Sequence, residues 1–280
     1  MKQIKLLGLT ALLGLATTVQ AQSPWTQKKN KAYVQASFTS ISNYDKLYGD
    51  PDYATERKIT DQTIQLYGEY GVSDATTLFA TVPLKMMKAG DLVVPGATPW
   101  TAEASESKLG NIQFGVKHNF YNKKWIISGQ LGIEANTSSY DAASGLRSGF
   151  DAWSFSPMVL VGRGFSNWYI QAFTGADVRT NAYSSNYRLG GELGYKAVSW
   201  LWVAGFLDGS AALGNGDRVV PVNNRLTGLY VNNISYAAFG LKLIGEINQK
   251  FGVNAAMGGA FGGRNVAKKP AFTFGVYYKL

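Results

Sequence analysis

The chain has 280 residues, of which 46% are hydrophobic and only 16% are charged, and its formal net charge at pH 7 is +9. It contains no cysteine and one histidine, which excludes disulfides, thiolate metal sites, cysteine nucleophiles and multi-histidine metal sites. Its 14 phenylalanines, 16 tyrosines and 7 tryptophans exclude a disordered chain, and a mean hydropathy of −0.09 excludes a bundle of membrane-spanning helices.

Residues 1–21 have the pattern of a secretory signal peptide. Lys2 and Lys5 form a positively charged start, an apolar run follows to Ala16, and Val19-Gln20-Ala21 resembles a cleavage site. A short membrane anchor is the alternative, but the apolar run is shorter than a spanning helix requires. We therefore expect a mature chain of residues 22–280 that begins at Gln22.

From residue 32 onward, apolar and polar residues alternate with the period of two that is typical of β-strands. Near the C-terminus, for example, Phe272, Phe274 and Val276 alternate with Thr273 and Gly275. The pattern predicts about twelve strands, with boundaries uncertain by a few residues. They lie at 32–42, 57–70, 75–86, 109–121, 125–137, 153–164, 167–179, 186–196, 199–211, 231–246, 250–261 and 270–280. The strand at 199–211 is apolar on both faces, so the sequence does not decide which of its residues point inward.

The connections between these strands alternate between short and long. The short ones are tight turns such as Gly71-Val72-Ser73-Asp74 and Tyr121-Asn122-Lys123-Lys124. Transmembrane barrels have short periplasmic turns and longer extracellular loops. The sequence therefore predicts an all-β fold for residues 22–280: a transmembrane, antiparallel, up-and-down β-barrel in the outer membrane of a Gram-negative bacterium, with both termini in the periplasm. The longer connections are expected at 43–56, 87–108, 138–152, 180–185, 212–230 and 262–269.

Aromatic residues gather beside the short turns, as in the aromatic girdle at a bilayer interface. The alternative is that they cap the core of a soluble β-protein. The residues concerned are Tyr70, Phe120, Tyr121, Trp125, Phe165, Trp168, Tyr195, Trp200, Trp202, Phe251 and Tyr278.

The polar face of the strands would then point into the lumen and line a channel or a ligand-binding site. The alternative is an internal network of ion pairs that holds the shape of the barrel. The charged candidates are Glu69, Lys85, Lys117, Glu134, Asp177, Arg179, Arg188, Glu192, Lys242 and Glu246. Glycines on the same face would leave room for water, a ligand or a large neighbouring side chain; these are Gly115, Gly190, Gly194 and Gly240.

Two of the long connections carry apolar residues. Leu92 and Trp100 belong to 87–108, and Val220 and Leu226 belong to 212–230. Exposed apolar loops often mark interaction sites. We expect either a surface that captures an apolar ligand and feeds the lumen, or loops that pack on one another and close the mouth.

The sequence favours a transporter over an enzyme. Outer-membrane phospholipases are twelve-stranded barrels with a His-x-Ser-Asn-Gly motif, whereas His118 is followed by Asn119, Phe120 and Tyr121, with no serine. Basic residues are scattered, which argues against nucleic acid as a partner. We expect no cofactor. The expected partners are outer-membrane lipid and lipopolysaccharide, a small-molecule ligand and the barrel-assembly machinery; the sequence leaves the oligomeric state open.

Three segments resemble the outer-membrane proteins of the phenol-degradation meta-pathway family. They are Glu69-Tyr70-Gly71-Val72-Ser73-Asp74, Thr77-Leu78-Phe79-Ala80-Thr81-Val82-Pro83, and the strand start Leu109-Gly110-Asn111, in which asparagine replaces the family's aspartate. The resemblance implies a barrel that transports small molecules. This family is distantly similar to long-chain fatty acid and hydrocarbon channels, which have fourteen strands and an N-terminal plug. The chain has only a short segment before its first strand, so we expect such a plug to be missing.

These observations predict a barrel that passively transports a small hydrophobic or aromatic molecule. A channel for polar solutes, of the nucleoside or sugar type, is the first alternative. A closed barrel with a structural or adhesive role is the second, because inward-pointing rings would block the lumen; these are Tyr67, Phe79, Tyr169, Phe173 and Tyr236.

Overall fold

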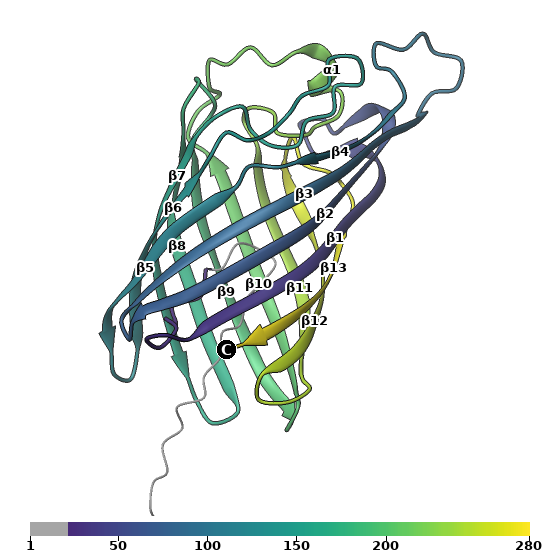
Figure 1. Ribbon diagram of the computed structural model, residues 1–280. Coiled ribbons are helices and arrows are strands. Elements are labelled where there is room, and N and C mark those ends of the chain that lie inside the picture. Colours follow the sequence, from purple (N-terminus) through teal and green to yellow (C-terminus); the bar gives the residue numbers. More distant parts are fainter. Residues whose placement is uncertain (1–21) are drawn as a thin grey trace, which may run out of the picture.

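The computed structural model describes residues 22–280, so the predicted signal peptide lies outside the described part of the chain. The strands form one antiparallel sheet that closes into a barrel, because β1 pairs with both β2 and β13 (Figure 1). The elements are β1 (Ala32–Leu47), β2 (Tyr53–Ser73), β3 (Thr76–Leu92), β4 (Ala104–Leu109), β5 (Gln113–Asn122), β6 (Ile126–Glu134), β7 (Ser154–Gly164), β8 (Trp168–Arg179), β9 (Asn186–Val198), β10 (Leu201–Ala212), α1 (Val222–Arg225), β11 (Ser235–Glu246), β12 (Phe251–Arg264) and β13 (Ala271–Lys279). In residues 22–280, no helix is long and apolar enough to cross a bilayer.

The predicted fourth strand is interrupted. β4 pairs with the second half of β3, and β5 pairs with the first half of β3. β4 and β5 therefore occupy the position of one strand beside β3. The break spans Gly110 to Ile112, where the Gly110 amide still donates to the carbonyl of Pro83. Counting β4 and β5 as one strand, the ring contains the twelve predicted strands.

The connections alternate between short and long, as predicted. We call the end with the short connections 74–75, 123–125, 165–167, 199–200 and 247–250 the turn end, and the opposite end the loop end. The connections predicted at 43–56 and 87–108 are wrong in extent, because β1, β2 and β3 continue far into them and β4 lies within the second. These extensions lack a regular apolar alternation, so the periodicity did not reveal them.

The outer surface of the barrel is apolar, since Leu66, Leu84, Phe114, Leu193 and Phe274 are all exposed. At the turn end an exposed aromatic belt surrounds the barrel, as expected of a bilayer interface; it includes Tyr70, Phe120, Tyr121, Trp125, Trp168, Tyr195, Trp200 and Phe251. The assignment of Trp202 to this belt is wrong. Trp202 is buried inside the barrel, and the uncertain phase of its strand, apolar on both faces, explains the error.

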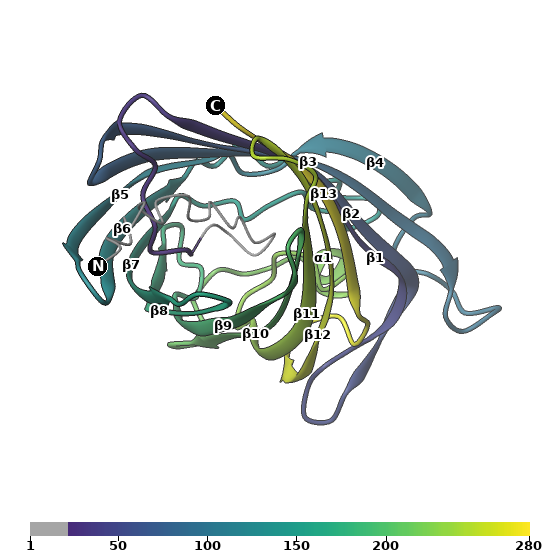
Figure 2. The ribbon, with the colours of Figure 1, turned by 90° about the horizontal axis from the view of Figure 1, so that it is seen from below.

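The lumen near the turn end is filled. Trp25, from the segment that precedes β1, packs among inward-facing side chains of the barrel wall. The Ser128 hydroxyl donates to the Pro24 carbonyl, and Lys117 Nζ donates to the Ser23 carbonyl at 3.0 Å. Figure 2, viewed from the turn end, shows this segment leaving the wall and entering the ring. We call residues 22–27 the N-terminal plug; this segment is short and differs from the plug of the fourteen-stranded channels, which is the kind that the sequence was expected to lack. Its neighbours are Tyr33, Tyr67, Phe79, Tyr169, Trp202, Ala204, Ile244 and Tyr277.

A second apolar cluster closes the loop end. Leu146 from the connection 135–153 and Leu229 from the connection 213–234 fold inward and pack against buried residues of the strands. The wall contributes Tyr44, Leu47, Ile59, Met87 and Ala89. Parts of the two long connections therefore lie over the mouth, and a cavity remains between this cover and the N-terminal plug.

Candidate functional site

The structure places all but one of the predicted lumenal charges inside the barrel. Glu69, Lys85, Lys117, Asp177, Arg188, Glu192 and Lys242 are buried, while Glu134 and Arg179 are partly buried. Glu246 lies instead at the rim of the turn end, where it forms a 3.0 Å ion pair with Lys196.

The buried lysines each have a carboxylate partner. Lys117 pairs with Glu69 at 2.9 Å, Lys85 pairs with Asp61 at 2.5 Å, and Lys242 pairs with Glu192. Buried charges require such compensation, because an unpaired charge is costly in a medium of low dielectric. These pairs join different strands, so they cross-brace the wall as well as neutralise it.

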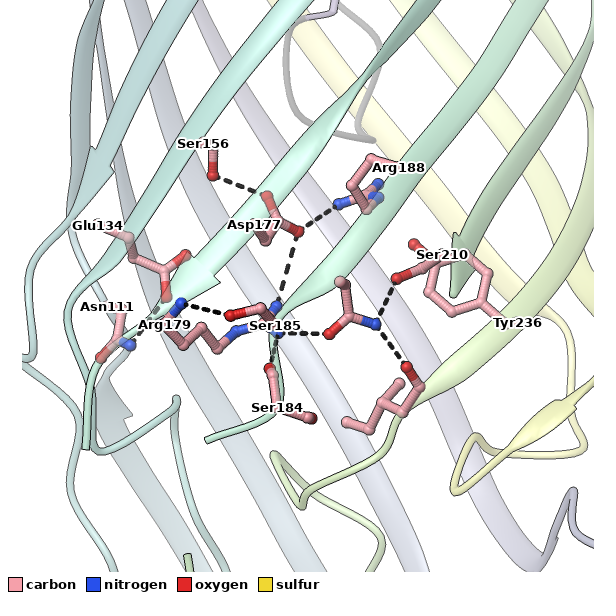
Figure 3. A network of polar contacts seen from close by, with 12 residues as sticks. Asn111, Glu134, Ser156, Asp177, Arg179, Ser184, Ser185, Arg188, Ser210 and Tyr236 are labelled. Carbon is pink, nitrogen blue, oxygen red and sulfur yellow. Dashed lines mark hydrogen bonds and ion pairs between the residues drawn. The ribbon is translucent and has the colours of Figure 1, made fainter. Parts of the chain in front are cut away.

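A separate cluster of charges lies nearer the loop end (Figure 3). Arg188 bridges two carboxylates, with Nη1 3.0 Å from Asp177 and Nη2 3.1 Å from Asp208. The Ser156 hydroxyl donates to Asp177 at 2.7 Å, and the Tyr236 hydroxyl donates to Asp208 at 3.3 Å. Arg188 is thus fixed in position, but its buried Nε has no hydrogen-bond acceptor in the described part of the chain.

Arg179 belongs to the same cluster. Its Nη1 donates to Asn186 Oδ1 at 2.6 Å, and its guanidinium lies 4.2 Å from the centre of the Phe150 ring. The Arg179 Nε is also buried without an acceptor among residues 22–280. Nearby, the Asn111 amide donates to Glu134 at 2.9 Å. The cluster therefore keeps unused hydrogen-bond donors on two arginines.

A cavity of about 570 Å³ adjoins the cluster and has two kinds of wall. One wall is charged, with Asp177, Arg179, Arg188 and Asp208, and a third carboxylate, Asp61 of β2, also lines the cavity. The other consists of small residues from β11 to β13, and aromatic rings lie between the two. The small residues are Ala238, Ala256, Gly258, Ala260 and Ala271; the rings are Tyr44, Phe150, Phe206, Tyr230 and Tyr236. A second cavity of about 270 Å³, lined by Lys85 and Glu134 among others, shares Asp177, Arg179 and Arg188 with the first.

Segments that are not part of the wall lie at both ends of the cavity. Toward the turn end it meets a small pocket of about 40 Å³ that Gln22 lines, and Phe206, Asp208 and Ala256 line both spaces. The Gln22 side-chain amide is buried there without a hydrogen-bond partner in the described part of the chain. Toward the loop end, Leu229 and Tyr230 cover the cavity.

The glycines on the inner face make room for large neighbouring side chains. A Cβ at each position would lie within 2.5 Å of an aromatic ring atom, which is closer than real contacts allow. The sequence left open whether this room is for water, a ligand or a large side chain; in the structure a large side chain occupies it. The pairs are Gly115 with Phe79, Gly190 with Phe173, Gly194 with Tyr169, and Gly240 with Phe206.

The four residues predicted to form capture loops lie in different places. Val220 and Leu226 line a groove on the surface of the loop end. Leu92 is the last residue of β3, and Trp100 protrudes with 74% of its surface exposed. The structure therefore brings Val220 and Leu226 together and separates them from Leu92 and Trp100.

Sequence reasoning missed Asp208, Phe150 and the N-terminal residues Gln22 and Trp25. Asp208 lies on the strand whose phase was open, and a single acidic residue among apolar neighbours was the available signal. Phe150 lies in a long connection, and nothing in its sequence context indicates that this connection folds into the lumen.

Comparison with known proteins identifies both a family and a fold. The family model described as "Putative MetA-pathway of phenol degradation" matches residues 54–274. No curated protein matches the chain in sequence.

Among solved structures, an outer membrane channel from Pseudomonas putida F1 superposes with a TM-score of 0.69 and 13% identity, covering 91% of this chain and 98% of that chain. A KdgM porin in complex with disordered oligogalacturonate superposes with a TM-score of 0.52 and 8% identity, covering 88% and 98%. The NanC porin superposes with a TM-score of 0.51 and 10% identity, covering 89% and 100%. The fold is therefore shared with outer-membrane channels and porins.

Proposed function

The chain belongs to the family described as "Putative MetA-pathway of phenol degradation", and from its channel-like barrel we infer that it carries a small molecule across the outer membrane. We propose that this molecule is amphipathic, with an aromatic or aliphatic body and one polar group. Because transmembrane barrels place their short turns in the periplasm, the turn end is periplasmic and the loop end is extracellular.

The observation that carries this proposal is the two-sided cavity of about 570 Å³. Its volume falls in the range of small-molecule sites, which combine apolar walls with a few fixed polar groups. Small side chains and aromatic rings would contact the body of the ligand. The guanidinium groups of Arg179 and Arg188, which line the cavity, would contact its polar group, and the surrounding carboxylates keep both groups in place.

Transport through this cavity requires two local movements. The N-terminal plug must leave the periplasmic end, and Leu229 with its connection must uncover the extracellular end. Neither segment is hydrogen-bonded into the ring as a strand. Both can therefore move while the barrel wall remains intact, and the resting protein would be a closed channel rather than an open pore.

Influx into proteoliposomes tests this function. Phenylacetate, which is amphipathic and charged at pH 7, serves as the probe, with arabinose and uridine as polar comparisons. Replacement of Ala256, which faces the cavity, by tryptophan fills the space and should abolish phenylacetate-driven swelling. The matched control is Ala255→Trp, on the next residue of the same strand. Ala255 pairs with Leu243 and Phe274, both of which are exposed on the outer surface, so this change should leave swelling intact.

The same experiment separates the two alternatives. Faster swelling with arabinose or uridine than with phenylacetate would favour a polar-solute channel. The charged wall and the similarity in fold to a porin solved with oligogalacturonate support this alternative. No swelling with any probe, together with no conductance in planar bilayers, would favour a closed barrel with a structural or adhesive role. The packed clusters at both ends of the lumen support that alternative.

A further inference from the structure

A groove of about 740 Å³ crosses the surface of the loop end, outside the lumen. The connection 213–234, which lies at the top of Figure 1 around α1, forms most of it. Its wall combines apolar residues with polar ones such as Asn215, Asn232 and Asn233, and Tyr53 and Asn265 complete it from other connections and strand ends. The apolar residues are Val219, Val220, Pro221, Val222, Leu226 and Val231.

Two arginines line this groove, and their surroundings differ. Arg218 is neutralised, because its Nη2 lies 2.5 Å from an Asp151 carboxylate oxygen and its guanidinium lies 5.7 Å from the Tyr183 ring. Arg225, the last residue of α1, is exposed and has no carboxylate within ion-pair distance among residues 22–280. The groove therefore offers one uncompensated positive charge beside an apolar surface.

We propose that this groove is the extracellular capture site and that it binds the carboxylate form of an aromatic or aliphatic acid. The Arg225 guanidinium would hold the carboxylate through paired hydrogen bonds, a geometry that its planar fork favours. The hydrocarbon body would lie against Val220 and Leu226. This inference rests on the proposed transport function and specifies the charge of its substrate.

The groove and the lumenal cavity meet at one residue. Asn265 lines both spaces, and its side chain is held from two sides. The Tyr53 hydroxyl donates to Asn265 Oδ1, and Asn265 Nδ2 donates to the Asn232 carbonyl at 2.8 Å. Asn232 belongs to the same connection as Leu229, so movement of that connection would release Asn265 and join the groove to the cavity. A captured acid would enter the lumen at this point.

Binding to the purified full chain in detergent tests the capture site without requiring transport. The probes are phenylacetate and its neutral analogue phenylacetamide, measured by titration calorimetry. We expect the wild-type protein to bind phenylacetate about tenfold more tightly, the factor that corresponds to one modest charge-assisted hydrogen bond. Arg225→Gln should remove this preference, and Arg225→Lys should keep only part of it, because lysine retains the charge but lacks the planar fork. Lys269→Gln removes one exposed positive charge outside the groove and should not change it.

The results distinguish this inference from the proposed function. If Arg225→Gln still prefers phenylacetate to phenylacetamide, the capture site is overturned. If Ala256→Trp blocks swelling in the same set of experiments, the transport function is still supported. If Arg225→Gln loses the preference and Lys269→Gln keeps it, the capture site is supported, whatever the swelling experiment shows. Tyr53→Phe removes one bond to Asn265 and should speed phenylacetate-driven swelling. An unchanged swelling rate would contradict the role of Asn265 as the partition.

Discussion

The ring of Tyr169 occupies the space that a side chain at Gly194 would need. These residues face each other on β8 and β9, and a Cβ on Gly194 would lie 2.1 Å from the Tyr169 ring. Because Tyr169 also contacts Trp25 and Trp202, a shift of its ring would disturb the whole aromatic layer at the turn end. The inward-facing glycine is therefore part of how the lumen is filled.

Gly194→Ala is expected to destabilise the barrel, because the added methyl group must displace Tyr169. Overpacking of this kind costs about 1–3 kcal/mol. The matched control is Gly205→Ala on β10, where a Cβ would meet no atom within 4 Å. The temperature at which the folded band disappears in heat-modifiable gel migration measures the effect. Equal midpoints for the two variants would refute the packing role of Gly194.

Trp25→Ala is expected to undock the N-terminal plug and to increase single-channel conductance in planar bilayers. Removal of a buried tryptophan side chain costs about 3–5 kcal/mol, and here that loss weakens the docking of a short segment rather than the barrel wall. The remaining contacts of the segment include hydrogen bonds from Ser128 and Lys117 to its carbonyl groups. Trp200→Ala, on the exposed aromatic belt, is the control and should conduct like the wild type. A Trp25→Ala channel that stays closed would show that the plug does not control the pore.

Sequence periodicity predicted the wall of the barrel because each wall residue has only two environments, lipid or lumen. Alternation therefore placed Lys117 and Arg188 inside and Leu193 and Phe274 outside without any knowledge of tertiary contacts. It failed for Trp202, whose strand is apolar on both faces. In such a strand either phase satisfies the pattern, and only pairing with the neighbouring strands decides it.

The contents of the lumen could not be predicted in the same way. Lys242 and Glu192 lie 50 positions apart, and the stagger of β9, β10 and β11 brings them together. The sequence around Trp25 resembles an ordinary linker before a first strand. Its insertion depends on the shape of a lumen that forms only when β1 meets β13, so no local pattern encodes it.

Loss of one partner from the Lys242–Glu192 pair is expected to be strongly destabilising. Both side chains are only 3% exposed, so Lys242→Met leaves an uncompensated buried carboxylate, at a cost of about 3–5 kcal/mol. The double variant Lys242→Met/Glu192→Gln should recover most of this loss, because the glutamine is neutral and can still accept from Tyr169. Guanidinium unfolding in detergent gives the midpoints. Lys268→Met removes one partner of an exposed pair and should leave the midpoint unchanged. A double variant no more stable than Lys242→Met would contradict the argument.

The cover of the loop end is expected to loosen in acid through Asp141. The Ser144 hydroxyl and amide both donate to this carboxylate and hold its pKa below the usual value. A lowered carboxyl pKa stabilises the folded turn fully above the unfolded pKa of about 3.9, and the stabilisation is lost as pH falls through the lower folded value. This turn positions Leu146 in the mouth, since the Asp141 amide donates to the Leu146 carbonyl at 2.9 Å.

Channel opening in planar bilayers should therefore be equal at pH 7 and pH 5 and more frequent near pH 3. Asp141→Asn keeps the shape of the side chain but weakens its hydrogen bonds, because the acceptor is no longer charged. We expect this variant to open more often than the wild type already at pH 7. Asp217→Asn, which removes an exposed carboxylate from the connection 213–234, is the control and should behave like the wild type. If Asp141→Asn and the wild type open equally at pH 7, the Asp141–Ser144 turn does not hold the cover in place.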